Sequence, residues 1–354
     1  MTDSVAVPEA TAQSALRVTP APLPHYRLLR ALPAYRWWKP LVALVLTLVL
    51  WVIFTTVVVI IGVLIAVAQG QITFTTTDAV LRQLTALFGV VNAGNPLSIS
   101  IGLIGVATLL PATLLGYLIV GLRPVSVLRS VAFRLRWRWL AFCLLPALAI
   151  TVLATLIQAL VFPALQAGSA LVAPTVPIGT FLLCAVIIVV VTPIQAAAEE
   201  FAFRGMITQM FGSWLRPAWL VIVLSAIPFA AAHTQYLGNG GSLTWATADV
   251  AVFALVAGFV TWRTGGIEAS IALHAINNTV AFLTLASSLA GSTSTSSQVS
   301  GDPFPLFLAF LVSVMTMGLY AFWIDRAARR RGLQNRLYPV AIADTSVAAA
   351  AGNS

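Results

Sequence analysis

Residues 41–67 of the chain read LVALVLTLVLWVIFTTVVVIIGVLIAV, an apolar stretch without a single charged side chain. A helix needs about 20 apolar residues to cross the hydrocarbon core of a bilayer, so this stretch is long enough to span a membrane. The whole chain agrees, because 60% of its 354 residues are hydrophobic and 8% are charged, against about 25% charged in soluble domains. The sequence therefore predicts an integral membrane protein and excludes an ordinary soluble fold.

Similar apolar windows recur along the chain and predict an all-α, polytopic transmembrane helical bundle, since lipid leaves open strand edges unsatisfied. The stretch 79–91 contains Arg82 and Gln83 and is followed by Asn92 and Gly94. We therefore expect a surface or re-entrant segment there. About eight spans are expected, at residues 41–67, 97–121, 139–162, 178–203, 218–235, 245–262, 267–288 and 305–324.

The basic residues test this count, because Lys and Arg accumulate in the cytoplasmic flanks of spans. All 19 except Arg82 fall before span one or after spans two, four, six and eight. This alternation predicts that both termini are cytoplasmic in a bacterial-type plasma membrane. We expect no nucleic-acid partner despite the net charge of +9, because such a partner needs a basic patch on one folded face.

The two ends of the chain differ in composition from the spans. Residues 1–40 are rich in Pro and Ala and lack the apolar core of a cleavable signal, so a flexible cytoplasmic tail is expected. Residues 41–324 are the expected membrane-embedded domain. Residues 325–354 are basic and then Ala-rich, which predicts a cytoplasmic C-terminal tail. Cys143 and Cys184 fall inside apolar spans and predict no disulfide.

Ionisable residues inside spans cost about 2.5–3.5 kcal/mol each on insertion scales, so each one needs a reason. Four of the ten acids lie in or near spans, namely Glu199, Glu200, Asp249 and Glu268. Asp249 and Glu268 are each close to the start of a span, where we expect them to face the interface or a helix N-terminus. We therefore place these two outside any site.

The acidic pair begins the motif EEFAFR, which ends at Arg204. Residues four apart share a helix face, so Glu200 can pair with Arg204, and such a buried ion pair alone would have a structural role. That role leaves Glu199 unexplained. A second carboxylate beside a paired one, in a low dielectric, is suited to act as a general base.

Two histidines and an asparagine extend this pattern. His233, near a span end, would by itself be typical of an interfacial or helix–helix hydrogen bond. His274 and Asn278 lie four apart on one helix face, which is also typical of contacts between helices. Taken together with Glu199, they supply a water activator, a proton shuttle and oxyanion donors, the set that peptide hydrolysis needs. The combination favours a catalytic site over separate structural roles.

The order EExxxR, FxxxH and HxxxN on successive apolar segments resembles the CPBP family of intramembrane proteases. This is the CAAX prenyl protease and bacteriocin-processing group, also called the ABI family. The motif residues are Glu199-Glu200 with Arg204, Phe229 with His233, and His274 with Asn278. The resemblance is anchored between residues 199 and 278 and extends loosely to the eight-span layout.

The resemblance implies an intramembrane endopeptidase acting on membrane-associated or lipidated peptides. It implies that Glu199 is the base that activates water, that Glu200 and Arg204 support it, and that His233 lies near the same water. It implies that the HxxxN pair stabilises the oxyanion. No cofactor is expected under this interpretation.

Three alternatives remain open at this point. Glu199, His233 and His274 could furnish a Zn²⁺ site with an open position for water, although the HExxH arrangement is absent. Intramembrane Glu and His also mark transporters, which would predict an internal repeat that the sequence lacks. The third alternative is a catalytically silent immunity or scaffold protein that sequesters peptides.

The depth of the motif residues presents a conflict. A span that enters at Ile178 places Glu199 about 31 Å along the helix, close to the cytoplasmic face. His233, well into the next span, would lie toward the outer face. The two residues can meet only if span four is shifted so that Arg204 lies inside the bundle, with Pro193 bending the helix.

Overall fold

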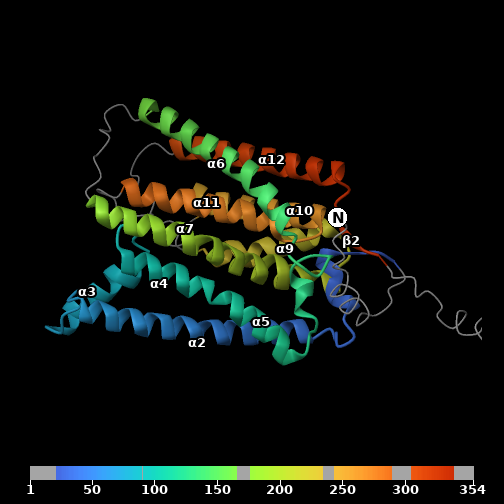
Figure 1. Cartoon of the computed structure of the whole chain (residues 1–354), viewed down its shortest axis with the longest axis horizontal. Helices are drawn as coiled ribbons and strands as arrows, with labels where there is room; N and C mark the ends of the chain where they lie inside the picture. The colour runs from blue at the N-terminus through green and yellow to red at the C-terminus, as the bar shows by residue number, and fades with distance from the viewer. Residues whose placement is uncertain (1–20, 90, 166–175, 234–242, 289–303, 339–354) are drawn as a thin grey trace, which may run out of the picture.

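The structure is a computed structural model of the chain, and it describes residues 21–89, 91–165, 176–233, 243–288 and 304–338. Within these ranges the chain is almost entirely helical, and its helices lie side by side as long rods (Figure 1). The all-α membrane fold expected from composition is confirmed.

Seven helical segments among the described residues are long and apolar enough to cross a membrane. An eighth apolar helix, α9 (Ala218–Ala231), has 14 residues and is shorter than a full span. Each of the eight expected segments thus contains a helix, but among the described residues seven of them, rather than eight, are long enough to span. The long segments are α2 (Lys39–Ala68), α4 (Pro96–Ala107) with α5 (Leu109–Val120), α6 (Trp137–Leu165), α7 (Ile178–Glu200) with η4 (Phe201–Ile207) and α8 (Thr208–Trp214), α10 (Trp245–Thr264), α11 (Glu268–Ser288) and α12 (Phe304–Arg330).

The remaining elements are short. The stretch expected to be a surface segment forms α3 (Thr77–Leu84) and η2 (Thr85–Gly89), neither of which is long enough to span. The others are η1 (His25–Ala31), η3 (Val125–Leu128), β1 (Leu23–Pro24) and β2 (Arg336–Leu337).

Helix α11 lies at the centre of the bundle, between α6 and α7 (Figure 1). On one side α7 also packs against α4, and on the other side α10 packs against α9 and α12. Helix α2 lies at the edge against α5, and most of its apolar surface is exposed. A helix that is apolar all round and exposed in this way is expected to contact lipid.

The end expected for span four, at residue 203, is wrong. The helix runs on through a π-helical turn at Phe201–Ile207 and then to Trp214, which makes 37 residues in all. Glu199 is 15 residues before Trp214, and His233 is 15 residues after Ala218, where α9 begins. By the rise of a helix, Glu199 and His233 thus each lie about 22 Å from the turn that joins α8 to α9. Because the helix continues to Trp214, Glu199 and His233 can lie at the same depth. The expected shift of span four would have had the same effect.

Residues 21–38 were expected to belong to a flexible tail, but they are packed onto the bundle. Leu28, Leu29 and Leu32 are fully buried, and η1 lies against α8. Strand β1 pairs with β2, which ties this segment to the residues that follow α12. The apolar residues of this segment cover one face of α8, whose Gln209 and Ser213 are also buried. Residues 339–354 of the expected C-terminal tail lie outside the described residues.

The stability of this packed segment should depend on pH through His25. His25 is fully buried, with Nε2 3.3 Å from the carbonyl oxygen of Leu128. Burial lowers its pKa from 6.5 to about 4. Stability is therefore intact above pH 6.5 and is lost as the pH falls toward 4, by roughly 3 kcal/mol. The thermal unfolding midpoint, measured in detergent at several pH values, should fall more steeply toward acid pH for the native protein than for His25→Gln. Equal slopes for the two proteins would contradict this account.

Candidate functional site

The acidic pair lies at the end of α7, in the interior of the bundle. Glu199 is 7% exposed and Glu200 is fully buried. Nη1 of Arg204 lies 3.0 Å from Oε1 of Glu200, so the expected ion pair at i, i+4 is present. The Arg204 guanidinium also lies over the ring of Phe229 at 4.2 Å. Arg204 thereby anchors the carboxylate of α7 to the FxxxH motif of α9.

His274 of α11 binds the same carboxylate. Its Nδ1 lies 2.8 Å from Oε1 of Glu200, and because a carboxylate only accepts, Nδ1 carries the hydrogen. The opposite ring nitrogen, Nε2, then lies 3.8 Å from Oε2 of Glu199. Glu200 thus fixes the orientation of the imidazole that faces Glu199.

His233, two residues beyond the end of α9, faces the same oxygen. Its Nδ1 lies 2.7 Å from the carbonyl oxygen of Phe229, which explains the four-residue spacing of the FxxxH motif. A carbonyl also only accepts, so Nδ1 of His233 donates and Nε2 is left toward Glu199 Oε2, at 3.9 Å. That oxygen is buried and has no hydrogen-bond partner among the described residues. Two imidazoles and one carboxylate oxygen therefore converge on one point.

Gln195 is a site residue that the sequence interpretation missed. Its Nε2 donates to Oε1 of Glu199, and its Oε1 accepts from Nδ2 of Asn278 at 3.3 Å. This chain of bonds joins α7 to α11 and places Asn278 beside Glu199. The signal was present, because Gln195 is a polar residue in an apolar stretch, one helical turn before Glu199.

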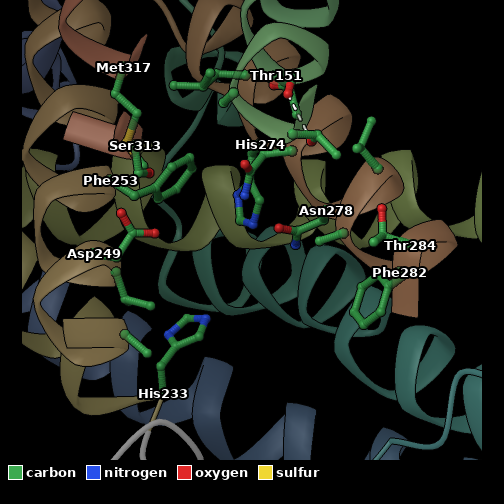
Figure 2. A pocket seen from close by; sticks show the side chains of 18 of the residues that line it. Thr151, His233, Asp249, Phe253, His274, Asn278, Phe282, Thr284, Ser313 and Met317 are labelled. Carbon is green, nitrogen blue, oxygen red and sulfur yellow. Dashed lines mark hydrogen bonds between the residues drawn. The ribbon is translucent and has the colours of Figure 1, made fainter. Parts of the chain in front are cut away.

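These side chains open onto a cavity of about 720 Å³. Figure 2 shows His274 and Asn278 of α11, and His233 just beyond the end of α9, pointing into it. Glu199 and Gln195 also line it, whereas Glu200 and Arg204 lie behind them and are not part of its wall. The structure therefore brings together all six residues singled out from the sequence, four on the cavity wall and two behind it.

The two other intramembrane acids differ from each other. Glu268 binds Arg136 at 2.6 Å and lies away from the cavity, as expected. Asp249, which was also placed outside the site, lines the cavity.

Glu199, His233 and His274 carry the kinds of donor atom that bind zinc. Ligands held at about 2.0–2.2 Å by a tetrahedral zinc ion lie roughly 3.4 Å from one another. Oε2 of Glu199 lies 3.9 Å from Nε2 of His233 and 3.8 Å from Nε2 of His274, and each histidine has a partner at Nδ1, as zinc ligands usually do. The donors suit zinc in kind, although among the described residues no group of three or more is close enough to hold a metal ion.

Comparison with known proteins adds to this geometry. Residues 180–280 match the family model described as Type II CAAX prenyl endopeptidase Rce1-like. The segment that carries the site is Rce1-like. The family resemblance drawn from the three motifs is thus confirmed, and the Rce1-like segment contains all seven motif residues.

A further relative is an uncharacterized Bacillus subtilis (strain 168) protein, YyaK. It is 30% identical over 156 residues, which cover 43% of this chain and 51% of YyaK. The matched region thus spans about half of the length of this curated relative. No solved structure matches the chain significantly.

Removing Arg204 should destabilise the protein strongly. Arg204→Met leaves the buried Glu200 carboxylate without its cation, which costs about 3–5 kcal/mol. The double variant Arg204→Met/Glu200→Gln should recover most of this loss, because no charge is then left unpaired. Thermal unfolding midpoints in detergent measure the effect, with Arg36→Met as a control for an exposed arginine. If Arg204→Met unfolded at the same temperature as Arg36→Met, the ion pair would have no such role.

Proposed function

We propose that the chain is an intramembrane endopeptidase in which Glu199 activates water to hydrolyse peptide bonds of membrane-associated or lipidated substrates. Membership of the Rce1-like segment in a protease family favours this function over a transporter or a scaffold protein. The observation that carries the proposal is Oε2 of Glu199, buried in a cavity with Nε2 of His233 and His274 at 3.9 and 3.8 Å.

These separations suit a shared water molecule. They are too long for direct hydrogen bonds, but one water can contact both Glu199 and a histidine at ordinary hydrogen-bond lengths. Glu199 accepts a proton from the water as the water oxygen attacks the substrate carbonyl carbon. His233 accepts the second hydrogen bond of this water through Nε2 and orients it. The proton held by Glu199 then passes to the leaving amine as the C–N bond breaks.

His274 and Asn278 stabilise the tetrahedral oxyanion. Because Nδ1 of His274 donates to Glu200, donation from Nε2 requires the imidazolium form. Nδ2 of Asn278 has two hydrogens, and the one not given to Gln195 supplies the second oxyanion donor.

The proposal also includes the kind of substrate and the side of the membrane on which the termini lie. The cavity wall is largely apolar and includes residues of α4, α6 and α11, such as Leu103, Ile150 and Phe282. Such a wall suits a peptide that arrives from the bilayer. From the alternation of arginines we propose that both termini lie in the cytoplasm, on the inner side of a bacterial-type plasma membrane.

Loss of the base should abolish hydrolysis. Purified native protein in detergent should cleave members of a lipidated peptide library, whereas Glu199→Gln should lower kcat by about a hundredfold to ten-thousandfold. His274→Ala should also lower kcat, because the oxyanion loses a donor. Asp78→Asn removes an exposed carboxylate far from the site and serves as the control. Equal inertness of the native and Glu199→Gln proteins would overturn the proposed function.

Gln195 is expected to act as a positioning residue. Gln195→Met keeps a similar volume but leaves Oε1 of Glu199 without its donor, so kcat should fall by about tenfold to a hundredfold. KM should change less than kcat, because the amide of Gln195 is bonded to Glu199 and Asn278. Steady-state kinetics combined with unfolding midpoints separate this role from a structural one. A fall in thermal stability with unchanged kcat would assign Gln195 to packing alone.

Chelators distinguish the glutamate mechanism from the zinc alternative. Zinc, if bound by Glu199, His233 and His274, would polarise the carbonyl and lower the pKa of its water. We expect incubation of active protein with 1,10-phenanthroline to leave the rate of peptide cleavage unchanged. If the chelator abolished peptide cleavage and added Zn²⁺ restored it, the glutamate mechanism would be contradicted. The protease assignment would remain intact.

A further inference from the structure

Asp249 of α10 lies on the cavity wall that faces the catalytic cluster. Its Oδ1 is buried and has no hydrogen-bond partner among the described residues, while Ser313 of α12 hydrogen-bonds the carboxylate. Figure 2 places Asp249 beside Phe253 and Ser313, across the cavity from Asn278. No lysine or arginine is present among the residues that line this cavity. Asp249 therefore has no lysine or arginine on the cavity wall to balance its charge.

Three of the four buried acids among the described residues have an arginine partner, whereas the catalytic base Glu199 and the half-buried Asp249 have none. Glu200, Glu268 and Asp325 are each paired with an arginine, at 3.0, 2.6 and 2.6 Å respectively. A carboxylate inside a membrane span is costly unless a cation or a hydrogen-bond donor offsets it. Oδ1 of Asp249, which has no hydrogen-bond partner among the described residues, is therefore open to a partner from outside the chain.

A helix N-terminus does not supply that partner. Helix α10 begins at Trp245, after a capping box formed by Thr244 and Thr247. Asp249 is the fifth helical residue, and the stabilisation of acids by the helix dipole falls off within the first turn. The explanation expected from the sequence, a carboxylate at a span start, therefore does not apply.

We propose that Asp249 forms a subsite for a basic side chain, lysine or arginine, of the substrate peptide, an inference that rests on the proposed peptidase function. The neighbouring wall suits such a side chain, since Trp245, Phe253 and Phe310 present apolar surface to its aliphatic stem. The cationic head then meets the Asp249 carboxylate. Long basic side chains commonly bury the stem and place the charge on a polar group in this way.

The position of this subsite along the substrate follows from the helix geometry. Asp249 lies one helical turn from Phe253, about 6 Å away, and the Phe253 ring lies 4.9 Å from the His274 ring. The subsite is thus on the order of 10 Å from the reacting groups, or two to three residues of extended peptide. The basic residue of the substrate should therefore lie two to three residues from the cleaved bond.

Cleavage of a matched peptide series tests the subsite. Each N-acetylated, lipid-anchored fluorogenic peptide carries one lysine at a different position, and the reference peptide carries norleucine. The native protein should cleave the peptide with lysine two or three residues from the bond with kcat/KM at least about tenfold above the reference. This ratio should fall toward one in Asp249→Asn and persist in Asp78→Asn. Asp249→Lys should prefer glutamate at the same position.

Binding measured without turnover keeps the two proposals separate. Fluorescence anisotropy of labelled peptides, in the Glu199→Gln background, should show about tenfold tighter binding of the lysine peptide, and adding Asp249→Asn should remove the difference. If the native protein cleaved no peptide but this binding difference remained, the peptidase function would fail and the subsite would stand. If peptides were cleaved and the lysine preference were equal in native and Asp249→Asn proteins, the subsite alone would be overturned.

Discussion

The buried carboxylate of Glu200 is the interaction around which the site is arranged. It receives Arg204 from one side and His274 from another, and Arg204 in turn reaches the ring of Phe229 and the carbonyl oxygen of Ala254. Four helices, α7, α9, α10 and α11, are thus connected through one anion. In an apolar interior a carboxylate separated from its cation is expensive, so the helices are held in the one arrangement that keeps it satisfied. The orientation of His274 toward Glu199 is a consequence of that arrangement.

The second constraint is the continuous helix that carries the acidic pair. The π-helical turn at Phe201–Ile207 follows Glu200 directly, and π-helical turns inside α-helices are frequent at functional sites. Because the chain continues to Trp214 and returns at once as α9, the two arms of this hairpin bring Glu199 and His233 to one level. Short helix α9 therefore suffices to present its histidine in the middle of the bundle.

Much of the fold could be predicted from composition, because apolar runs of span length leave few other solutions in lipid. The motif residues could be found because Glu199, His233 and His274 are polar groups in apolar surroundings. The end of span four was misplaced, since Thr208 and Gln209 look like loop residues by hydropathy but are buried beneath η1. Gln195 was missed because an uncharged amide in a span is ordinary by itself, and its role appears only when the partners are placed.

The central claim is that the acid of α7 and the histidine of α9 share one cavity at one depth, and its most direct test is cross-linking in the membrane. In a background with Cys143→Ala and Cys184→Ala, the pair Glu199→Cys/His233→Cys would be treated with a bifunctional thiol reagent about 5 Å long. The account predicts an internal cross-link, detected by mass spectrometry of the joined peptides, and none for the pair Ile178→Cys/His233→Cys. A cross-link in the second pair and none in the first would contradict it.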